Sequence, residues 1–149
     1  MSADRIEKSI VLRAPRARVW RALTTPDEFG RWFGARLAGD FAPGARVTGQ
    51  ITTPGHEHLT FEMVVEKVQP EGLFSFRWHP YAFDPAVDYA SEPMTLVELR
   101  LAEVADGTQL SVTESGFDRI PPARRAEAFR MNEQGWAGQL QNIQGYVSA

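Results

Sequence analysis

The sequence contains no cysteine, and this absence excludes several kinds of chemistry. Without thiols the chain forms no disulfide, presents no thiolate nucleophile, and holds neither a cysteine-type zinc site nor a cysteine-ligated iron–sulfur cluster. No apolar run approaches the roughly 20 residues of a membrane-spanning helix. The N-terminus mixes acids with bases and has no apolar signal segment, so we expect a cytoplasmic protein with no membrane partner.

An excess of one charge is missing as well. Sixteen basic residues face nineteen acidic ones, the net charge is −3, and neither sign forms a long block. Nucleic acid is therefore not an expected partner. The motifs Gly-x-Ser-x-Gly, His-Glu-x-x-His and the phosphate-binding loop are absent, so the common hydrolase, zinc-protease and nucleotide sites have no support, and we expect neither metal nor cofactor.

The remaining composition is that of one ordinary globular domain, which we expect to span residues 1–149. Apolar and polar residues alternate over residues 6–13, which predicts a first strand. Pro15 and Pro26 then each begin a short predicted helix, with Thr25 as the N-cap of the second, which runs to about Phe33.

Alternating segments after these helices predict some six further strands, and the Asp106-Gly107 pair predicts a hairpin turn between the last two. After Pro122, apolar residues recur at helical spacing, which predicts a long C-terminal helix. We interpret its glycines as positions where the helix lies close to the sheet; they are Gly135, Gly138 and Gly145. The elements together predict an α+β fold in which a helix rests on a curved antiparallel sheet.

A curved sheet does not follow a helix along its whole length, so we expect a cavity between them. Most of the candidate wall residues are aromatic, as is typical of ligand sites. The candidates for ligand binding are Trp32, Phe33, Phe61, Phe76, Trp78, Tyr81, Glu114, Phe117, Trp136 and Leu140. Plain core packing is the alternative role for each of the aromatic residues.

Glu114 and His79 are the candidates for catalysis. Glu114 is in phase with Leu110 and Val112 and so points inward if their face is buried, where a carboxylate needs partners or a proton. It would then orient a ligand hydroxyl or act as a general acid or base. From the sequence we favour a different interpretation, in which Glu114 lies near the strand end and either reaches solvent or pairs with an arginine. His79 precedes a proline and is expected at the rim of the cavity.

Two further groups of residues have a functional and a structural interpretation. His56 and His58 are two positions apart, as in some metal sites, but the preceding Pro-Gly turn favours exposed histidines without a metal. Residues 80–93 form a long loop whose Tyr81, Phe83 and Tyr89 either close over the cavity, form a homodimer contact or pack locally.

Five short segments, in order along nearly the whole chain, resemble the SRPBCC or START-like superfamily, in the branch homologous to the activator of the heat-shock chaperone ATPase. They are the segment from Ala14-Pro15 to Pro26, then Trp32-Phe33, Pro43-Gly44, Glu114-Ser115-Gly116-Phe117, and Gly135-Trp136 with Leu140. The resemblance implies the helix-grip fold, a seven-stranded antiparallel sheet around a C-terminal helix and a hydrophobic pocket.

The segments 74–80 and 114–121 are also similar to small bacterial proteins labelled vanillate demethylase reductase-like, although the chain has no cysteine for a cluster and no Gly-x-Gly-x-x-Gly. Since one fold serves many activities, we keep three functional hypotheses. The first is binding of a small apolar or aromatic molecule. The second is a cyclase- or hydrolase-type enzyme that uses Glu114, and the third is a chaperone-type interaction protein.

Overall fold

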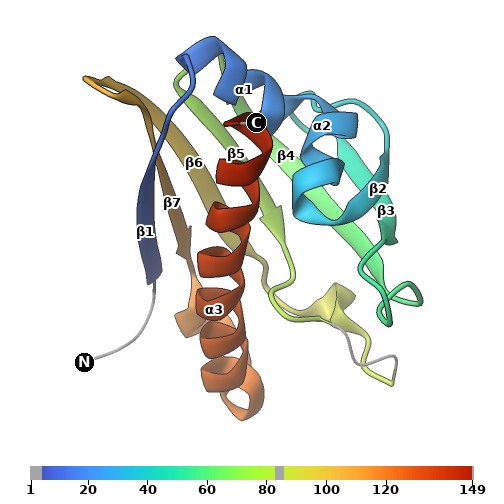
Figure 1. The fold of residues 1–149 in the computed structure, drawn as a ribbon. Helices are drawn as coiled ribbons and strands as arrows, with labels where there is room; N and C mark the ends of the chain where they lie inside the picture. Colours follow the sequence, from blue (N-terminus) through green and yellow to red (C-terminus); the bar gives the residue numbers. More distant parts are fainter. Residues whose placement is uncertain (1–4, 83–85, 149) are drawn as a thin grey trace.

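A computed structural model describes residues 5–82 and 86–148, and Figure 1 shows its arrangement. Its seven strands form one antiparallel sheet in the order β1-β7-β6-β5-β4-β3-β2, so the predicted α+β helix-grip fold is confirmed. The strands are β1 (Arg5–Leu12), β2 (Ala35–Ala38), β3 (Arg46–Ile51), β4 (Thr60–Gln69), β5 (Leu73–Trp78), β6 (Thr95–Val104) and β7 (Gly107–Ser115). The helices are α1 (Arg16–Thr24), α2 (Pro26–Phe33) and α3 (Pro122–Val147), with short 3-10 turns η1 (Tyr89–Ser91) and η2 (Phe117–Arg119).

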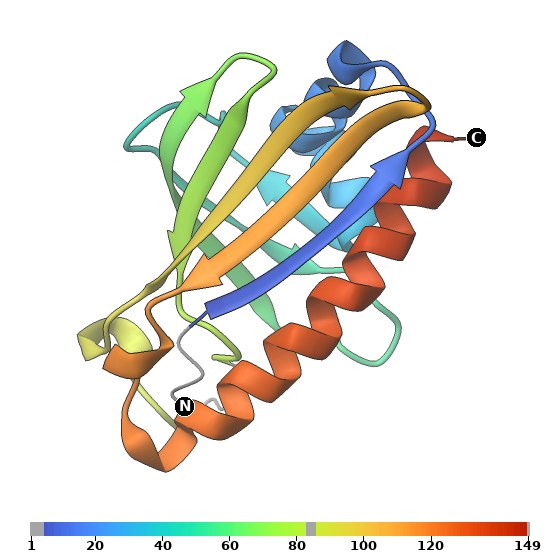
Figure 2. The same ribbon diagram turned by 90° about the vertical axis from the view of Figure 1, so that its left-hand side faces the viewer.

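The sheet curves, and α3 runs along its concave side while α1 and α2 lie beside the C-terminal end of α3 (Figures 1 and 2). A bulge interrupts the pairing of β4 with β5 between Val65 and Lys67, and such bulges increase the local twist and bend. Gly107 closes the β6–β7 hairpin at φ +146°, where an added Cβ would collide with the Leu12 carbonyl. The turn predicted from Asp106-Gly107 is confirmed.

Both predicted short helices are present: α1 begins at Arg16, directly after Pro15, and α2 runs from Pro26 to Phe33 as predicted. Thr25 is the N-cap of α2, but its side chain makes no capping hydrogen bond, and only its backbone carbonyl accepts from Phe29. Gly34 ends α2 in the left-handed region at φ +95°, which glycine adopts without a steric penalty. Phe29 is fully buried, so α2 packs against the hydrophobic core mainly through its apolar face.

Helix α3 buries the predicted stripe, in which Trp136, Leu140, Ile143 and Val147 are all buried. The interpretation of its glycines was wrong. An added Cβ at any of the three meets no atom within 4 Å, because Gly135 borders an open cavity and Gly138 and Gly145 are exposed. In the described part of the chain, no helix combines the length and hydropathy of a membrane span.

Glu28 joins the three helices at one end of the sheet. Its carboxylate accepts hydrogen bonds from Arg18 at 2.7 Å, Arg21 at 3.0 Å and the Tyr146 hydroxyl at 3.0 Å. Partial burial, the largest single influence, would raise the pKa of Glu28, but the hydrogen bonds from Arg18 and Tyr146 and the nearby arginine charges hold it below the ordinary 4.5.

A depressed pKa makes the contribution of Glu28 to stability dependent on pH. The contribution is fully present above the unfolded-state value of 4.5 and is lost as the pH falls through the lower folded-state pKa. We expect Glu28→Gln to lower the free energy of unfolding by about 1–3 kcal/mol at neutral pH. As the pH falls below 4.5, the variant should lose less stability than the wild type does. Urea unfolding at a series of pH values measures both effects. Asp27→Asn, which removes only an exposed ion pair with Arg31, is the control and should change stability by under about 0.5 kcal/mol. Equal acid profiles for wild type and Glu28→Gln would contradict this assignment.

Candidate functional site

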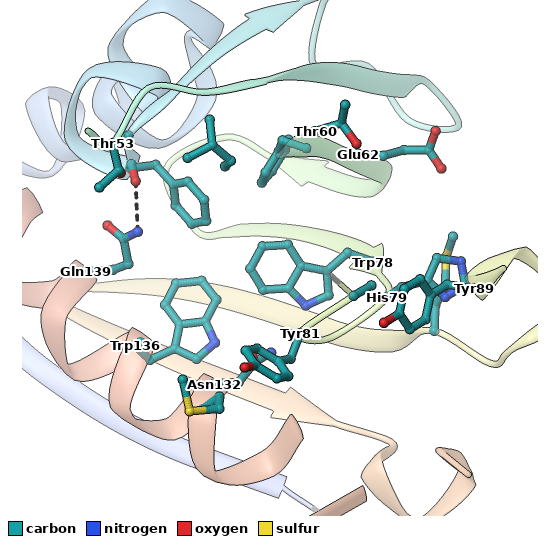
Figure 3. A pocket seen from close by; sticks show the side chains of 18 of the residues that line it. Thr53, Thr60, Glu62, Trp78, His79, Tyr81, Tyr89, Asn132, Trp136 and Gln139 are labelled. Carbon is teal, nitrogen blue, oxygen red and sulfur yellow. Dashed lines mark hydrogen bonds between the residues drawn. The ribbon is translucent and has the colours of Figure 1, made fainter. Parts of the chain in front are cut away.

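A partly enclosed cavity of about 580 Å³ lies between β3, β4, the end of β5 and the middle of α3. Its volume falls within the range of small-molecule sites, roughly 300–1,000 Å³. Figure 3 shows Trp78 and Trp136 near its centre, Thr60 and Glu62 on the β4 side, and His79 and Tyr89 toward one end. The larger apolar side chains in its lining are Phe33, Ile51, Phe61, Trp78, Met94, Met131 and Trp136.

Four of the lining rings form one continuous aromatic surface. The Trp78 and Trp136 rings lie 5.8 Å apart, inclined by 31°, and Phe61 meets Trp78 at 6.0 Å. Phe33 contacts Phe61 at 5.3 Å and Trp78 at 5.9 Å. The rings come from α2, β4, β5 and α3, and edge-to-face and tilted contacts of this kind hold each ring in place.

Glu114 is fully buried at the end of β7, behind this surface. One carboxylate oxygen, Oε1, accepts from Trp136 Nε1 at 2.8 Å and from Asn132 Nδ2 at 3.0 Å. The other, Oε2, accepts from Trp78 Nε1 at 2.7 Å, from the Thr95 hydroxyl at 2.6 Å and from the same amide at 3.0 Å. The carboxylate therefore fixes both cavity indoles through their only hydrogen-bonding groups.

The interpretation that we favoured for Glu114 from the sequence was wrong. The side chain neither reaches solvent nor pairs with an arginine, because two indoles, an amide and a hydroxyl satisfy it inside the fold. The inward phase with Leu110 and Val112 is what the structure shows, since all three are buried on one face of β7. Glu114 is not itself part of the cavity lining, whereas three of its partners are: Trp78, Asn132 and Trp136.

The candidate ligand residues separate into two groups. Phe33, Phe61, Trp78, Tyr81 and Trp136 line the cavity. The others lie outside the lining and pack in the core, as in Trp32, whose Nε1 donates to the Ala22 carbonyl. The remaining members of this second group are Phe76, Phe117 and Leu140, together with the buried Glu114.

His79 lines the cavity near the foot of the loop that follows β5. Its Nδ1 atom is buried and has no hydrogen-bond partner within residues 5–82 and 86–148. Burial lowers the pKa of His79 below 6.5, and the opposing effects of Glu92 and Glu62 do not reverse this. The imidazole is therefore neutral at physiological pH, and it makes no hydrogen bond to Glu114 that would form an acid–base pair.

The sequence reasoning missed the polar residues that α3 contributes to the cavity. Met131, Gly135 and Gln139 are spaced at i, i+4 and i+8, and Asn132 precedes Trp136 by four, so both rows lie on neighbouring strips of the helix. Gln139 donates to the Phe33 carbonyl at 2.9 Å and so ties α3 to α2 (Figure 3). The available signal was the spacing from the predicted wall residue Trp136, which Asn132 precedes by four positions and Gln139 follows by three.

The loop after β5 is attached to the first turn of α3 by Arg124. The guanidinium donates to the Pro80 carbonyl at 2.8 Å and to the Tyr81 carbonyl at 3.3 Å, and it pairs with Glu92 at 2.7 Å. It also lies over the Tyr89 ring at 4.8 Å. Tyr81 and Tyr89 both line the cavity, so Arg124 fixes the two described ends of this loop there; Phe83 lies outside the described residues.

We expect Arg124→Lys to loosen these attachments, because a lysine ammonium cannot reproduce the planar fork. The expected result is a loss of about 1–2 kcal/mol in stability and faster hydrogen exchange at residues 86–92, measured by mass spectrometry. Arg125→Lys is the matched control, since the Arg125 guanidinium donates to the nearby Ile120 carbonyl and not to the described part of this loop. Unchanged exchange in Arg124→Lys would refute the attachment.

His56 and His58 are exposed in the turn between β3 and β4. Nowhere in residues 5–82 and 86–148 do three histidine, cysteine, aspartate or glutamate side chains gather in a way that would hold a metal ion.

Comparison with solved structures confirms this architecture. Protein MLL2253 from Mesorhizobium loti is 23% identical, with 95% of this chain and 94% of that chain covered and a TM-score of 0.73. DynU16, described as a putative protein in the dynemicin biosynthetic locus, is 25% identical over 98% of this chain and 48% of its own, with a TM-score of 0.75. The Aha1 dimer from Colwellia psychrerythraea is 17% identical, with 97% of this chain and 96% of that chain covered and a TM-score of 0.72.

No curated protein sequence matches the chain. The profile of the family described as activator of Hsp90 ATPase homolog 1-like protein matches residues 13–148, which hold α1, α2, six of the seven strands and α3. Together with the helix-grip fold and the cavity, this match shows that the chain belongs to the family of activator of Hsp90 ATPase homolog 1-like proteins.

Proposed function

We propose that the protein binds a small apolar or aromatic molecule in the cavity between the sheet and α3. The observation that carries this proposal is a cavity of about 580 Å³ walled by four aromatic rings that are already fixed in position. Because the rings are held by contacts with one another, binding requires little ordering of the wall.

The enzyme hypothesis has less support in the geometry. A general acid or base must lie within hydrogen-bond reach of the reacting atom. Glu114 accepts five hydrogen bonds from protein donors and is separated from the cavity by three of those partners. This arrangement favours a positioning role for Glu114.

The chaperone-type hypothesis predicts a sizeable exposed apolar patch and little cavity. In the described residues, the large exposed apolar side chains are Val11, Val87 and Val104, which lie on β1, on the loop before η1 and at the end of β6. Separate exposed valines together with a large cavity favour the hypothesis of ligand binding over the chaperone-type hypothesis.

Two measurements test the proposal. Native mass spectrometry of the purified protein should show an additional bound mass of small-molecule size. Titration with a naphthalene-based probe should then quench the tryptophan emission with a saturable curve, because Trp78 and Trp136 line the cavity. If no such probe saturates the protein and no bound mass is found, the proposal fails.

We propose in addition that two copies of the chain associate. The support is the solved relative from Colwellia psychrerythraea, whose description is of a dimer. Sedimentation equilibrium should give twice the chain mass of 16.7 kDa, and a single-chain mass throughout the concentration series would exclude it.

A further inference from the structure

Among the residues that the structure describes, the buried carboxylate of Glu114 has no cationic partner. Its five hydrogen bonds come from two indoles, one amide and one hydroxyl, all of them neutral groups. Fully buried acidic residues are otherwise rare unless they are paired with a cation. The indole and amide N–H groups are donors only, so the arrangement suits a carboxylate that accepts at both oxygens.

The negative charge lies directly behind the cavity wall. Trp78, Asn132 and Trp136 each line the cavity and each donate to Glu114 over 2.7–3.0 Å. In a low-dielectric interior a charge at this range acts strongly on a ligand seated against the same side chains. An anionic ligand would therefore be repelled across the wall.

The other charges of the lining do not offset this effect. Arg46 and Glu62 pair with each other at 2.8 Å, and both are well exposed, so water screens them. His79 also lines the cavity, and burial lowers its pKa, so it is neutral. Glu114 is thus the buried charge that a ligand meets at the aromatic surface.

Asn132 gives the cavity one directed polar group. Its Nδ2 donates to both oxygens of Glu114 at 3.0 Å, which fixes the orientation of the amide. Its Oδ1 makes no hydrogen bond to any described residue, although Asn132 lines the cavity. An amide carbonyl is an acceptor only, so its natural partner is a hydroxyl or amine N–H of a ligand.

From these observations we propose that the cavity selects neutral planar aromatic molecules that carry a hydrogen-bond donor, and that it rejects aromatic carboxylates. The ring stacks on the Trp78–Trp136 surface, and the donor meets Asn132 Oδ1. Glu114 sets this selectivity without touching the ligand, so it is a positioning and specificity-determining residue. This inference rests on the proposed function and specifies its ligand class.

Three probes of one ring system test the selectivity of the wild-type protein: 2-naphthol, 2-methylnaphthalene and 2-naphthoate. At neutral pH the first is a neutral donor, the second lacks a donor, and the third is an anion of similar shape. We expect 2-naphthol to bind about 5-fold or more tightly than 2-methylnaphthalene and at least about tenfold more tightly than 2-naphthoate, measured by tryptophan quenching and calorimetry.

Glu114→Gln identifies the source of the discrimination. We expect the preference for naphthol over naphthoate to fall to within about threefold in this variant, because the amide carries no charge. Glu98→Gln is the matched control, since it removes the same charge from the outer face of β6 and should keep the wild-type ratio. If Glu114→Gln does not fold, the relative affinities of the three probes for the wild-type protein alone decide whether the proposed selectivity holds.

The outcomes separate the two proposals. Equal or tighter binding of 2-naphthoate in the wild-type protein overturns the selectivity while leaving ligand binding intact. Equal binding of 2-naphthol and 2-methylnaphthalene overturns the role of Asn132. If none of the three probes binds, the proposed function fails, and the selectivity fails with it.

Discussion

Glu114→Gln is expected to lower the free energy of unfolding by about 2–4 kcal/mol, one of the largest effects of any conservative substitution in this chain. The glutamine amide would turn N–H groups toward donors that now point at a carboxylate, chiefly Trp78, Trp136 and Asn132. At least one buried indole N–H then loses its partner. Urea unfolding gives the stability, and near-ultraviolet circular dichroism reports whether the two indoles remain fixed.

The control for this prediction is again Glu98→Gln. Glu98 makes an exposed contact with Arg100 at 2.9 Å, so its loss should cost under about 0.5 kcal/mol. If the two variants were equally stable, the five hydrogen bonds of Glu114 would contribute little, and the cavity wall would have to be held by ring packing alone.

Gly135→Leu is expected to weaken ligand binding strongly while stabilising the fold. Gly135 lines the cavity between Met131 and Gln139 on one strip of α3, and a Cβ there meets no atom within 4 Å. A leucine side chain would enter the ligand space, and we expect at least a tenfold loss of affinity. Replacing glycine inside a helix should at the same time raise stability by up to about 1 kcal/mol.

Gly138→Leu separates these two effects. Gly138 is exposed, also has free space around an added Cβ, and is not part of the cavity lining. It should gain the same helix propensity and bind probes as the wild type does. Unweakened binding in Gly135→Leu would show that ligands do not use this cavity, whereas weakened binding in both variants would indicate a general change in α3.

Much of the fold follows from local pattern. The alternation of Phe61, Met63 and Val65 identifies the buried face of β4, and the Asp106-Gly107 pair identifies the last hairpin. These signals lie within a few residues of each other, so they can be recognised in a single sequence. The family resemblance is confirmed by the matched profile over residues 13–148.

The cavity depends on relations that are not local. The inward phase of Glu114 is visible in the sequence, but its indole partners lie 36 and 22 positions away, and their approach depends on strand register and on the rotation of α3. Asn132 and Gln139 have the appearance of surface residues of an amphipathic helix. The same rotation explains why Leu140 packs in the core while Gln139 beside it faces the cavity.

The pairing of β1 with β7 has a consequence for how the molecule is made. Residues 5–12 have their hydrogen-bonding partners at residues 108–115, roughly a hundred positions later. Closing so long a loop is slow, so β1 stays an unpaired strand until β7 is available to it. The helix that completes the cavity follows β7 in the chain, so the binding site forms only after these distant segments have come together.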